Sequence, residues 1–330
     1  MQSFDYGHAA DIGEALANGD APNTVFLAGG TELLNWLRLG VAKPARVIDL
    51  ARLKGFADIT RLPGGGLRIG ALARLNDVAL NDDVARDYPV LSQAILKSAS
   101  AQLRNLATIG GNPLQKTRCG YFRAEETLPC NKRKLGSGCS ALKGINDKHA
   151  IFGWSEACVA TQPSDPATAL SALDALYVTE HKDGGRRIKA EDLHTLPGDT
   201  PHIDNALRDG ELIVGIELVG AARHSAYLKL RERESYEFAI VSAAVALDLE
   251  GDRILRARIA LGSVAHKPWR LNQAECALSG VAANDTAAIR RALDASLVDA
   301  KTLAHNAYKV RLAKNAAERA IRLAAARTPS

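Results

Sequence analysis

An apolar strand, a Gly-Gly turn and the start of a helix follow one another in the stretch VFLAGGTEL, residues 25–33. The stretch TIGGN, residues 108–112, repeats the Gly-Gly turn after a predicted helix. Glycine lets backbone N–H groups come close to a phosphate, and a helix N-terminus favours negative charge. The two Gly-Gly stretches fit a pyrophosphate cradle, with two ordinary tight turns as the alternative. Neither has the G-x-G-x-x-G pattern, which disfavours a Rossmann dinucleotide site.

The elements around these stretches predict an α+β chain in three parts, with boundaries near residues 53 and 222. Residues 1–53 read β-α-β-α-β, and Asp11 is the expected N-cap of the first helix. Asp165 is the expected N-cap of a later helix, because Pro166 follows it. The elements predicted after residue 53 are a hairpin turning at 63–66, helical stretches at 74–88, 89–107 and 165–175, strands at 176–181, 210–219, 225–234 and 241–264, and helices near 271–280, 285–297 and 301–325.

Apolar periodicity disappears in a loop at about residues 113–158, and this cysteine loop contains four of the five cysteines, spaced C-x10-C-x8-C-x18-C. Structural zinc sites usually include a C-x2-4-C pair, which is absent here. Three interpretations stay open from the residues alone: four ligands of a [4Fe–4S] cluster, two disulfides, or unrelated thiols. The fifth cysteine, Cys276, is expected to be a buried structural thiol.

The positive charge of the chain is concentrated in the cysteine loop. Residues 113–150 contain eight Lys or Arg and three Asp or Glu, which accounts for the whole formal net charge of +5. A cluster with four thiolate ligands is anionic, and burying it requires compensating positive charge. Disulfides are neutral and need no compensation, so the charge favours the cluster.

Composition excludes several other classes of function. Aromatic residues make up 5% of the chain, and basic residues outside the loop are dispersed, which argues against a nucleic-acid partner. No apolar run approaches the length of a membrane span. The first residues have neither a basic region nor an apolar core, so no export signal is expected. No paired-carboxylate or Ser-His-Asp spacing predicts a catalytic acid or base.

Several motifs together resemble the FAD-binding subunits of the molybdenum hydroxylases, the family of xanthine dehydrogenase and carbon monoxide dehydrogenase. The motifs are FLAGGTELL, ATIGGN, TQPSDP and LGSVAHKPWR followed by NAYKVRLAKNAAERA, and their order is kept over essentially the whole chain. The cysteine loop is similar to the [4Fe–4S] insertion in FAD subunits of periplasmic aldehyde oxidoreductases. The resemblance implies a two-part FAD-binding domain of the PCMH/VAO type at 1–222, with subdomains 1–53 and 54–222. A C-terminal α/β domain of the carbon monoxide dehydrogenase flavoprotein type is implied at 223–330.

The resemblance also assigns site residues by position. The implied [4Fe–4S] ligands are Cys119, Cys130, Cys139 and Cys158, and no catalytic residue is implied on this chain. The implied FAD contacts are Val25, Phe26, Leu27, Ala28, Gly29, Gly30, Thr31, Glu32 and Leu33 in the first Gly-Gly stretch, Thr108, Ile109, Gly110, Gly111 and Asn112 in the second, and Thr117, Asp165 and Lys229 elsewhere.

The function implied by the resemblance is that of an electron-transfer subunit in a heterotrimer that oxidises aldehydes to carboxylic acids. A large subunit would hold the molybdenum cofactor and a small subunit two [2Fe–2S] clusters, and this chain would pass electrons from those clusters through FAD to an external acceptor. The resemblance favours a periplasmic location, reached by export together with a partner that carries a signal, with a cytoplasmic location as the alternative. The alternatives are the FAD subunit of a hydroxylase for N-heterocycles or aromatic acyl-CoA compounds, and a scaffold whose cluster is purely structural.

Overall fold

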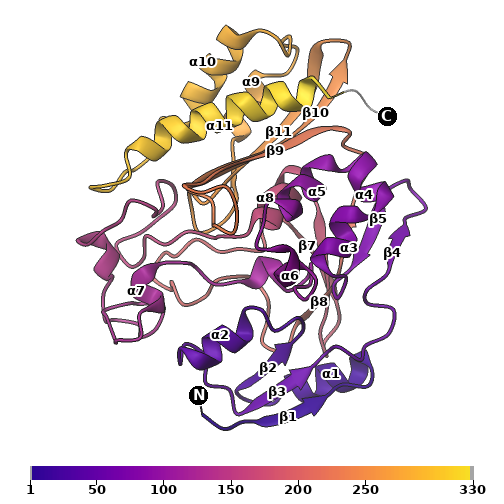
Figure 1. Ribbon diagram of the computed structural model, residues 1–330, viewed down its shortest axis with the longest axis vertical. Coiled ribbons are helices and arrows are strands. Elements are labelled where there is room, and N and C mark those ends of the chain that lie inside the picture. The colour runs from indigo at the N-terminus through magenta and orange to yellow at the C-terminus, as the bar shows by residue number, and fades with distance from the viewer. Residues whose placement is uncertain (1, 328–330) are drawn as a thin grey trace.

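The computed structural model describes residues 2–327 and contains three β-sheets with helices between and around them (Figure 1). Met1 and residues 328–330, the outer ends of the two predicted domains, lie outside the described residues. The first sheet is parallel, in the order β1-β3-β2, and helices α1 and α2 connect its strands. This is the predicted β-α-β-α-β unit. Its elements are β1 (Asp5–His8), α1 (Ile12–Gly19), β2 (Thr24–Leu27), α2 (Leu33–Arg38) and β3 (Arg46–Asp49).

Local sequence explains how the two helices of this unit begin and end. The Asp11 side chain caps α1 by accepting a hydrogen bond from the Glu14 N–H at 2.9 Å, and the Glu14 carboxylate accepts one from the Ala10 N–H at 2.7 Å. Reciprocal bonds of this kind satisfy N–H groups that the first helical turn leaves unpaired. Two residues after α2, Gly40 has a φ of +64°, a conformation that glycine adopts without strain.

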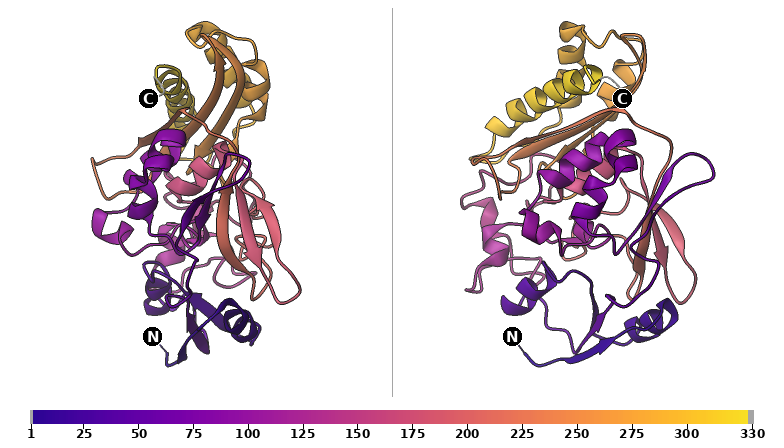
Figure 2. Two further views of the ribbon diagram at one scale, coloured as in Figure 1. Left: turned by 90° about the vertical axis from the view of Figure 1, so that its right-hand side faces the viewer. Right: turned by 45° about the vertical axis from the view of Figure 1, so that its right-hand side comes forward.

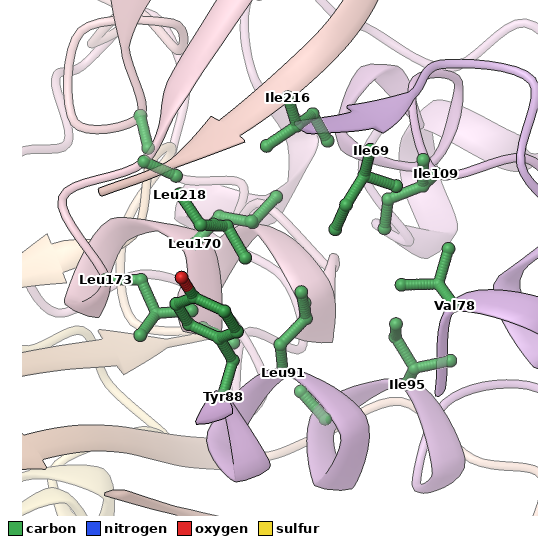
Figure 3. Close-up of a cluster of buried hydrophobic side chains, with 14 of the residues drawn as sticks. Ile69, Val78, Tyr88, Leu91, Ile95, Ile109, Leu170, Leu173, Ile216 and Leu218 are labelled. Carbon is green, nitrogen blue, oxygen red and sulfur yellow. The ribbon is translucent and has the colours of Figure 1, made fainter. Parts of the chain in front are cut away.

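The second sheet is antiparallel, in the order β4-β5-β8-β6-β7. Apolar side chains of β5 and β8 meet those of α5 and α8 in the largest buried cluster of the chain (Figure 3). The elements of this part are β4 (Ile59–Arg61), β5 (Leu67–Gly70), α3 (Leu75–Leu80), α4 (Asp82–Asp87), α5 (Pro89–Leu96), α6 (Ala101–Arg104), α8 (Asp165–Ala172), β6 (Leu176–Glu180), β7 (Arg186–Lys189) and β8 (Leu212–Leu218).

Three details of this part differ from the sequence prediction. The two helical stretches at 74–107 form four helices, because Asn81 has extended backbone and caps α4, and Ser100 caps α6. The N-cap of α8 is Ser164, whose hydroxyl accepts from the Ala167 N–H at 3.0 Å, and Asp165 is the first helical residue. Strand β7 was not expected, because its sequence RRIK has a single buried apolar residue, Ile188.

The third sheet is antiparallel, in the order β12-β11-β10-β9, and α11 crosses one of its faces (Figure 2). Helices α5 and α8 contact the other face, so they lie between the second and third sheets. In residues 2–327 we find no helix that combines the length and the apolar character needed to cross a bilayer. The elements are β9 (His224–Leu230), β10 (Val241–Glu250), β11 (Arg253–Gly262), β12 (Trp269–Arg270), α9 (Asn272–Ala277), α10 (Thr286–Ser296) and α11 (Tyr308–Ala325).

The cysteine loop has little regular structure, as predicted, and is held by side chains from the rest of the chain. Its short helical turns are η1 (Asn112–Leu114), α7 (Gly120–Arg123) and η2 (Ser140–Leu142). In Figure 1 the loop occupies the region between α2 and α11. At its far end, the fully buried Lys309 of α11 donates to the carbonyls of Lys148 and His149 at 3.1 and 2.8 Å.

Candidate functional site

The two Gly-Gly stretches pack directly on neighbouring backbone. A Cβ atom added at Gly29 would lie 2.0 Å from the carbonyl oxygen of Leu106, two residues before the second stretch. A Cβ at Gly110 would lie 2.6 Å from the Cβ of Ala71. Gly30 has a φ of +71°, which strains any residue with a side chain. Glycine is therefore required for this packing, which brings the first stretch beside the second.

The first Gly-Gly stretch offers a row of unpaired backbone donors. Within residues 2–327, the N–H groups of residues 28–32 have no hydrogen-bond partner in the protein. The second stretch is fixed from the side, because the Ser164 hydroxyl donates to the Asn112 side-chain oxygen at 2.6 Å. Clustered free N–H groups in a glycine turn bind anions, so the geometry fits the pyrophosphate of a dinucleotide.

Asp165 and Lys229 lie together in a buried ion pair rather than on an open surface. The Lys229 ammonium lies 2.8 Å from one carboxylate oxygen of Asp165, and the Tyr227 hydroxyl donates to the other at 2.5 Å. Burial raises the pKa of Asp165, and the Lys229 ammonium opposes that rise. The pair joins α8 to β9, one residue from Ser164 and thus near the second stretch. Contact of this pair with FAD stays a prediction.

Glu32 connects the first Gly-Gly stretch to the cysteine loop. Its carboxylate accepts hydrogen bonds from Arg118 at 2.7 Å, from Arg123 at 2.5 Å and from the Trp36 indole at 2.6 Å. Both carboxylate oxygens of Glu32 thus accept hydrogen bonds from the protein, whereas its backbone N–H is one of the unpaired donors of residues 28–32. Thr117 lies at the start of the loop, and its hydroxyl oxygen accepts from the Cys119 N–H at 3.2 Å.

The four loop cysteines line a single cavity. Cys119, Cys130, Cys139 and Cys158 surround a space of about 290 Å³, part of it open to solvent, and all four are free thiols. The backbones of Cys130 and Cys139 lie side by side in an isolated antiparallel β-bridge. Cys276 is also free, but it is exposed on α9, so the prediction that it is buried is wrong.

Backbone N–H groups donate to three of these sulfurs. Cys119 accepts from Tyr121 and Phe122, and burial raises its pKa to about 11. The Cys139 thiolate accepts from Cys158 and from the N–H groups of Ala141, Leu142 and Val159, which lowers its pKa to about 6 although burial opposes this. The pKa of Cys158 is raised, because its thiol donates the hydrogen bond to Cys139 and because it is buried. The Cys158 sulfur also accepts from the Ala160 N–H. N–H donors around cysteine sulfur are a means by which proteins stabilise and tune iron–sulfur clusters.

The four cysteines supply the number and type of ligands that a [4Fe–4S] cluster needs. Within residues 2–327, no three His, Cys, Asp or Glu side chains lie close enough together to hold one metal ion. A tetrahedral ion such as zinc requires sulfurs within about 4 Å of one another. A [4Fe–4S] cube takes one thiolate at each of its four irons and holds them farther apart. Four cysteines around one cavity match that ligand number, while the hydrogen bond between Cys158 and Cys139 brings two of the sulfurs into direct contact.

A second cavity adjoins the cysteine cavity. Thr117 and Lys132 line both, and the second cavity has an empty volume of about 310 Å³. Two buried histidines also line it, His194 and His266, and burial lowers their pKa values to about 4 and about 3. Residues 113–115 and Thr117, which continue from the second Gly-Gly stretch, form another wall. His266 belongs to the motif LGSVAHKPWR, which gave it no role, and no motif included His194 or the third lining residue Asp204, because loops far apart in sequence bring these residues together.

Much of the positive charge of the loop is already paired. Lys116 and Lys132 each lie 2.6 Å from an Asp204 oxygen, and Lys148 lies 2.6 Å from Glu232. Together with the pairing of Arg118 and Arg123 to Glu32, this reduces the charge left over for a cluster. Lys132 is the cation best placed to compensate negative charge at the cysteines, because its side chain is 4% exposed and its charge lowers the pKa of Cys158.

Comparison with known proteins shows that the chain contains two domains of known families. Residues 2–218 match the model of the FAD binding domain in molybdopterin dehydrogenase, and residues 225–324 match the CO dehydrogenase flavoprotein C-terminal domain. The aldehyde oxidoreductase FAD-binding subunit PaoB of Escherichia coli (strain K12) is 44% identical over 95% of this chain and 96% of its own length. The glyceraldehyde dehydrogenase medium chain of Sulfolobus acidocaldarius is 28% identical over 86% of this chain and 83% of its own.

A solved structure agrees with this assignment. A carbon monoxide dehydrogenase chain from Hydrogenophaga pseudoflava, from an enzyme that lacks the Mo-pyranopterin moiety, superposes with a TM-score of 0.76 at 26% identity, covering 99% of this chain and 98% of that one. The expected α+β fold is thereby confirmed, and the FAD-binding domain over residues 2–218 supports FAD as a cofactor. The chain belongs to the FAD-binding subunits of the molybdenum hydroxylase family, and it is an oxidoreductase subunit.

Proposed function

We propose that this chain is the FAD- and [4Fe–4S]-carrying electron-transfer subunit of a heterotrimeric, molybdenum-dependent aldehyde oxidoreductase. The 44% identity to an aldehyde oxidoreductase FAD-binding subunit over nearly the whole chain supports the aldehyde as substrate class. In this proposal a large subunit oxidises the aldehyde at molybdenum and a small subunit carries two [2Fe–2S] clusters. Electrons then reach an external acceptor by way of this chain. A periplasmic location, through export with a signal-bearing partner, is part of the same proposal and is tested by cell fractionation.

The observation that carries the cluster proposal is the convergence of four cysteines on one cavity. Three of the sulfurs accept hydrogen bonds from backbone N–H groups, which come from residues 121–122 and 141–142 of the loop and from residues 159–160 just after it. A structural thiol needs no such donors, whereas a cluster ligand uses them to spread its negative charge. Thr117 and Lys132 line both the cysteine cavity and the adjoining cavity, which supports a cluster close to the residues that follow the second Gly-Gly stretch.

The chemistry of the chain is therefore the positioning of two redox groups. Bound FAD supplies the exchange between two-electron and one-electron steps. The free N–H groups of residues 28–32 hold the negative pyrophosphate, and Gly29 keeps the two Gly-Gly stretches in contact. Lys132 holds a positive charge between the two cavities, and the thiolates of the loop bind the cluster. None of these tasks needs an acid or base, which agrees with the lack of a catalytic pair in the sequence.

The role in electron transfer is tested with the purified three-subunit complex. An aldehyde should bleach the flavin absorption at about one equivalent, and the isolated chain with the same aldehyde should stay oxidised. Cys130→Ser removes the cluster and shows whether the cluster lies on the electron path or has a purely structural role. Cys276→Ser is the matched cysteine control. A complex whose flavin is never reduced by any aldehyde would contradict an electron-transfer role for this chain.

A further inference from the structure

Two arginines of the cysteine loop converge on one carboxylate of the FAD site. Arg118 and Arg123 lie 2.7 and 2.5 Å from the two Glu32 oxygens, and all three side chains are at most one quarter exposed. Two cations around one carboxylate in a half-buried setting form strong, charge-assisted hydrogen bonds. Because Glu32 is also the last residue of the unpaired N–H row, these bonds fix the orientation of that row.

The arginines are themselves positioned by the cysteine loop. Arg118 directly precedes Cys119, donates to the Gln115 side chain at 2.8 Å and lies over the Phe238 ring at 4.4 Å. Arg123 ends α7, the short helix that starts after Cys119, and its Nε donates to the Thr117 carbonyl at 2.9 Å. A change in the position of Cys119 therefore moves both guanidinium groups.

Apart from the packing of Gly29 on the Leu106 backbone, the first Gly-Gly stretch is held through its carbonyl groups, which accept hydrogen bonds from the start of α2. Helix α2 is six residues long, and residues 28–32 donate no backbone hydrogen bond within the described chain. The bonds to the Glu32 side chain therefore add a connection to the cysteine loop that the Gly29 packing and the carbonyl bonds do not supply.

We propose that Glu32, Arg118 and Arg123 couple the two sites, so that the chain binds FAD tightly only when the cysteine loop is held by its cluster. Glu32 then acts as a positioning residue, not as a ligand of FAD through its side chain. The proposal rests on the cluster of the proposed function. Coupling is reciprocal, so bound FAD also stabilises the loop in its cluster-binding form. The consequence is that each of the two cofactors raises the affinity of the chain for the other.

The test compares FAD affinity with and without the cluster in the full chain. Flavin is removed, half of the protein is then stripped of iron with an oxidant and a chelator, and both samples are titrated with FAD by flavin fluorescence. Iron removal should weaken binding about tenfold, within the range usual for coupled sites. In Glu32→Gln and Arg123→Gln, affinity should be low and nearly the same with or without iron. Lys148→Gln, which removes a cation of the same loop paired to Glu232, should behave as the wild type.

The outcomes separate the two proposals. Equal FAD affinity of wild-type protein with and without iron overturns the coupling, and it leaves the cluster intact. A chain purified with no iron–sulfur cluster overturns both. Because the wild-type comparison needs no variant, the result holds even if Glu32→Gln fails to fold.

Discussion

Substitution of Gly29 by alanine should damage FAD binding in a way that the structure quantifies. The new Cβ would lie 2.0 Å from the Leu106 carbonyl oxygen, 2.8 Å from its carbon and 3.0 Å from the Ala107 Cα, whereas ordinary contact begins at 3.4 Å. All three atoms are backbone, so no side chain can rotate away. The two Gly-Gly stretches must separate by roughly 1 Å, and forcing an extra methyl into packed backbone costs about 1–3 kcal/mol.

A loss of that size in the bound state weakens FAD binding roughly tenfold to a hundredfold. The assay is titration of flavin-free protein with FAD by fluorescence, together with thermal unfolding of the flavin-free form. Gly64→Ala is the matched control, because its Cβ meets no atom within 4 Å and its φ is not positive. If Gly29→Ala binds FAD as tightly as Gly64→Ala, the contact between the stretches does not support the site and the reasoning fails.

Three further predictions concern the cysteine loop and the stability of the fold. Cys130→Ser should lower the iron content and open the loop to trypsin at the exposed Lys134, whereas Cys276→Ser should keep both properties; protease resistance without iron would contradict a metal-organised loop. Lys132→Gln should lower the reduction potential of the cluster by tens of millivolts in an EPR titration, because reduction adds negative charge; an unchanged potential, equal to that of the exposed control Lys143→Gln, would rule out compensation by Lys132. Burial raises the pKa of Glu211, but bonds from Arg186, Arg208 and Thr179 outweigh it and hold that pKa at about 2. The stability gained from this carboxylate is therefore present above its ordinary pKa of 4.5 and lost as the pH falls toward 2. Glu211→Gln should flatten this acidic limb when the free energy of unfolding is measured against pH. A curve parallel to that of the wild type would speak against it.

Local patterns predicted the elements that place the site. The apolar run before Gly29 and the amphipathic run after it gave strand β2 and helix α2, since both signals lie within a few residues. The lack of periodicity and the clustered cysteines likewise predicted a loop organised around something other than apolar packing. The break between α3 and α4 was missed, because apolar residues continue at helical spacing through Asn81, whose capping bonds decide the outcome.

Contacts between distant residues could not be predicted. Glu32 meets arginines 86 and 91 residues away, and Asp165 meets Lys229 64 residues away. Nothing near any of these residues indicates its partner, because the pairing depends on how whole elements pack. The same limit explains Cys276, whose helical pattern suggested burial while α9 presents it to solvent.

The central claim is that this chain carries a [4Fe–4S] cluster beside its FAD. The most direct measurement is the amount of iron and acid-labile sulfide per flavin in the chain purified without oxygen. We expect about four irons and about four sulfides per chain, with one flavin that acid releases, and loss of the iron in Cys130→Ser. A flavin-replete chain with no iron or sulfide, or with the loop cysteines joined in disulfides, would contradict it.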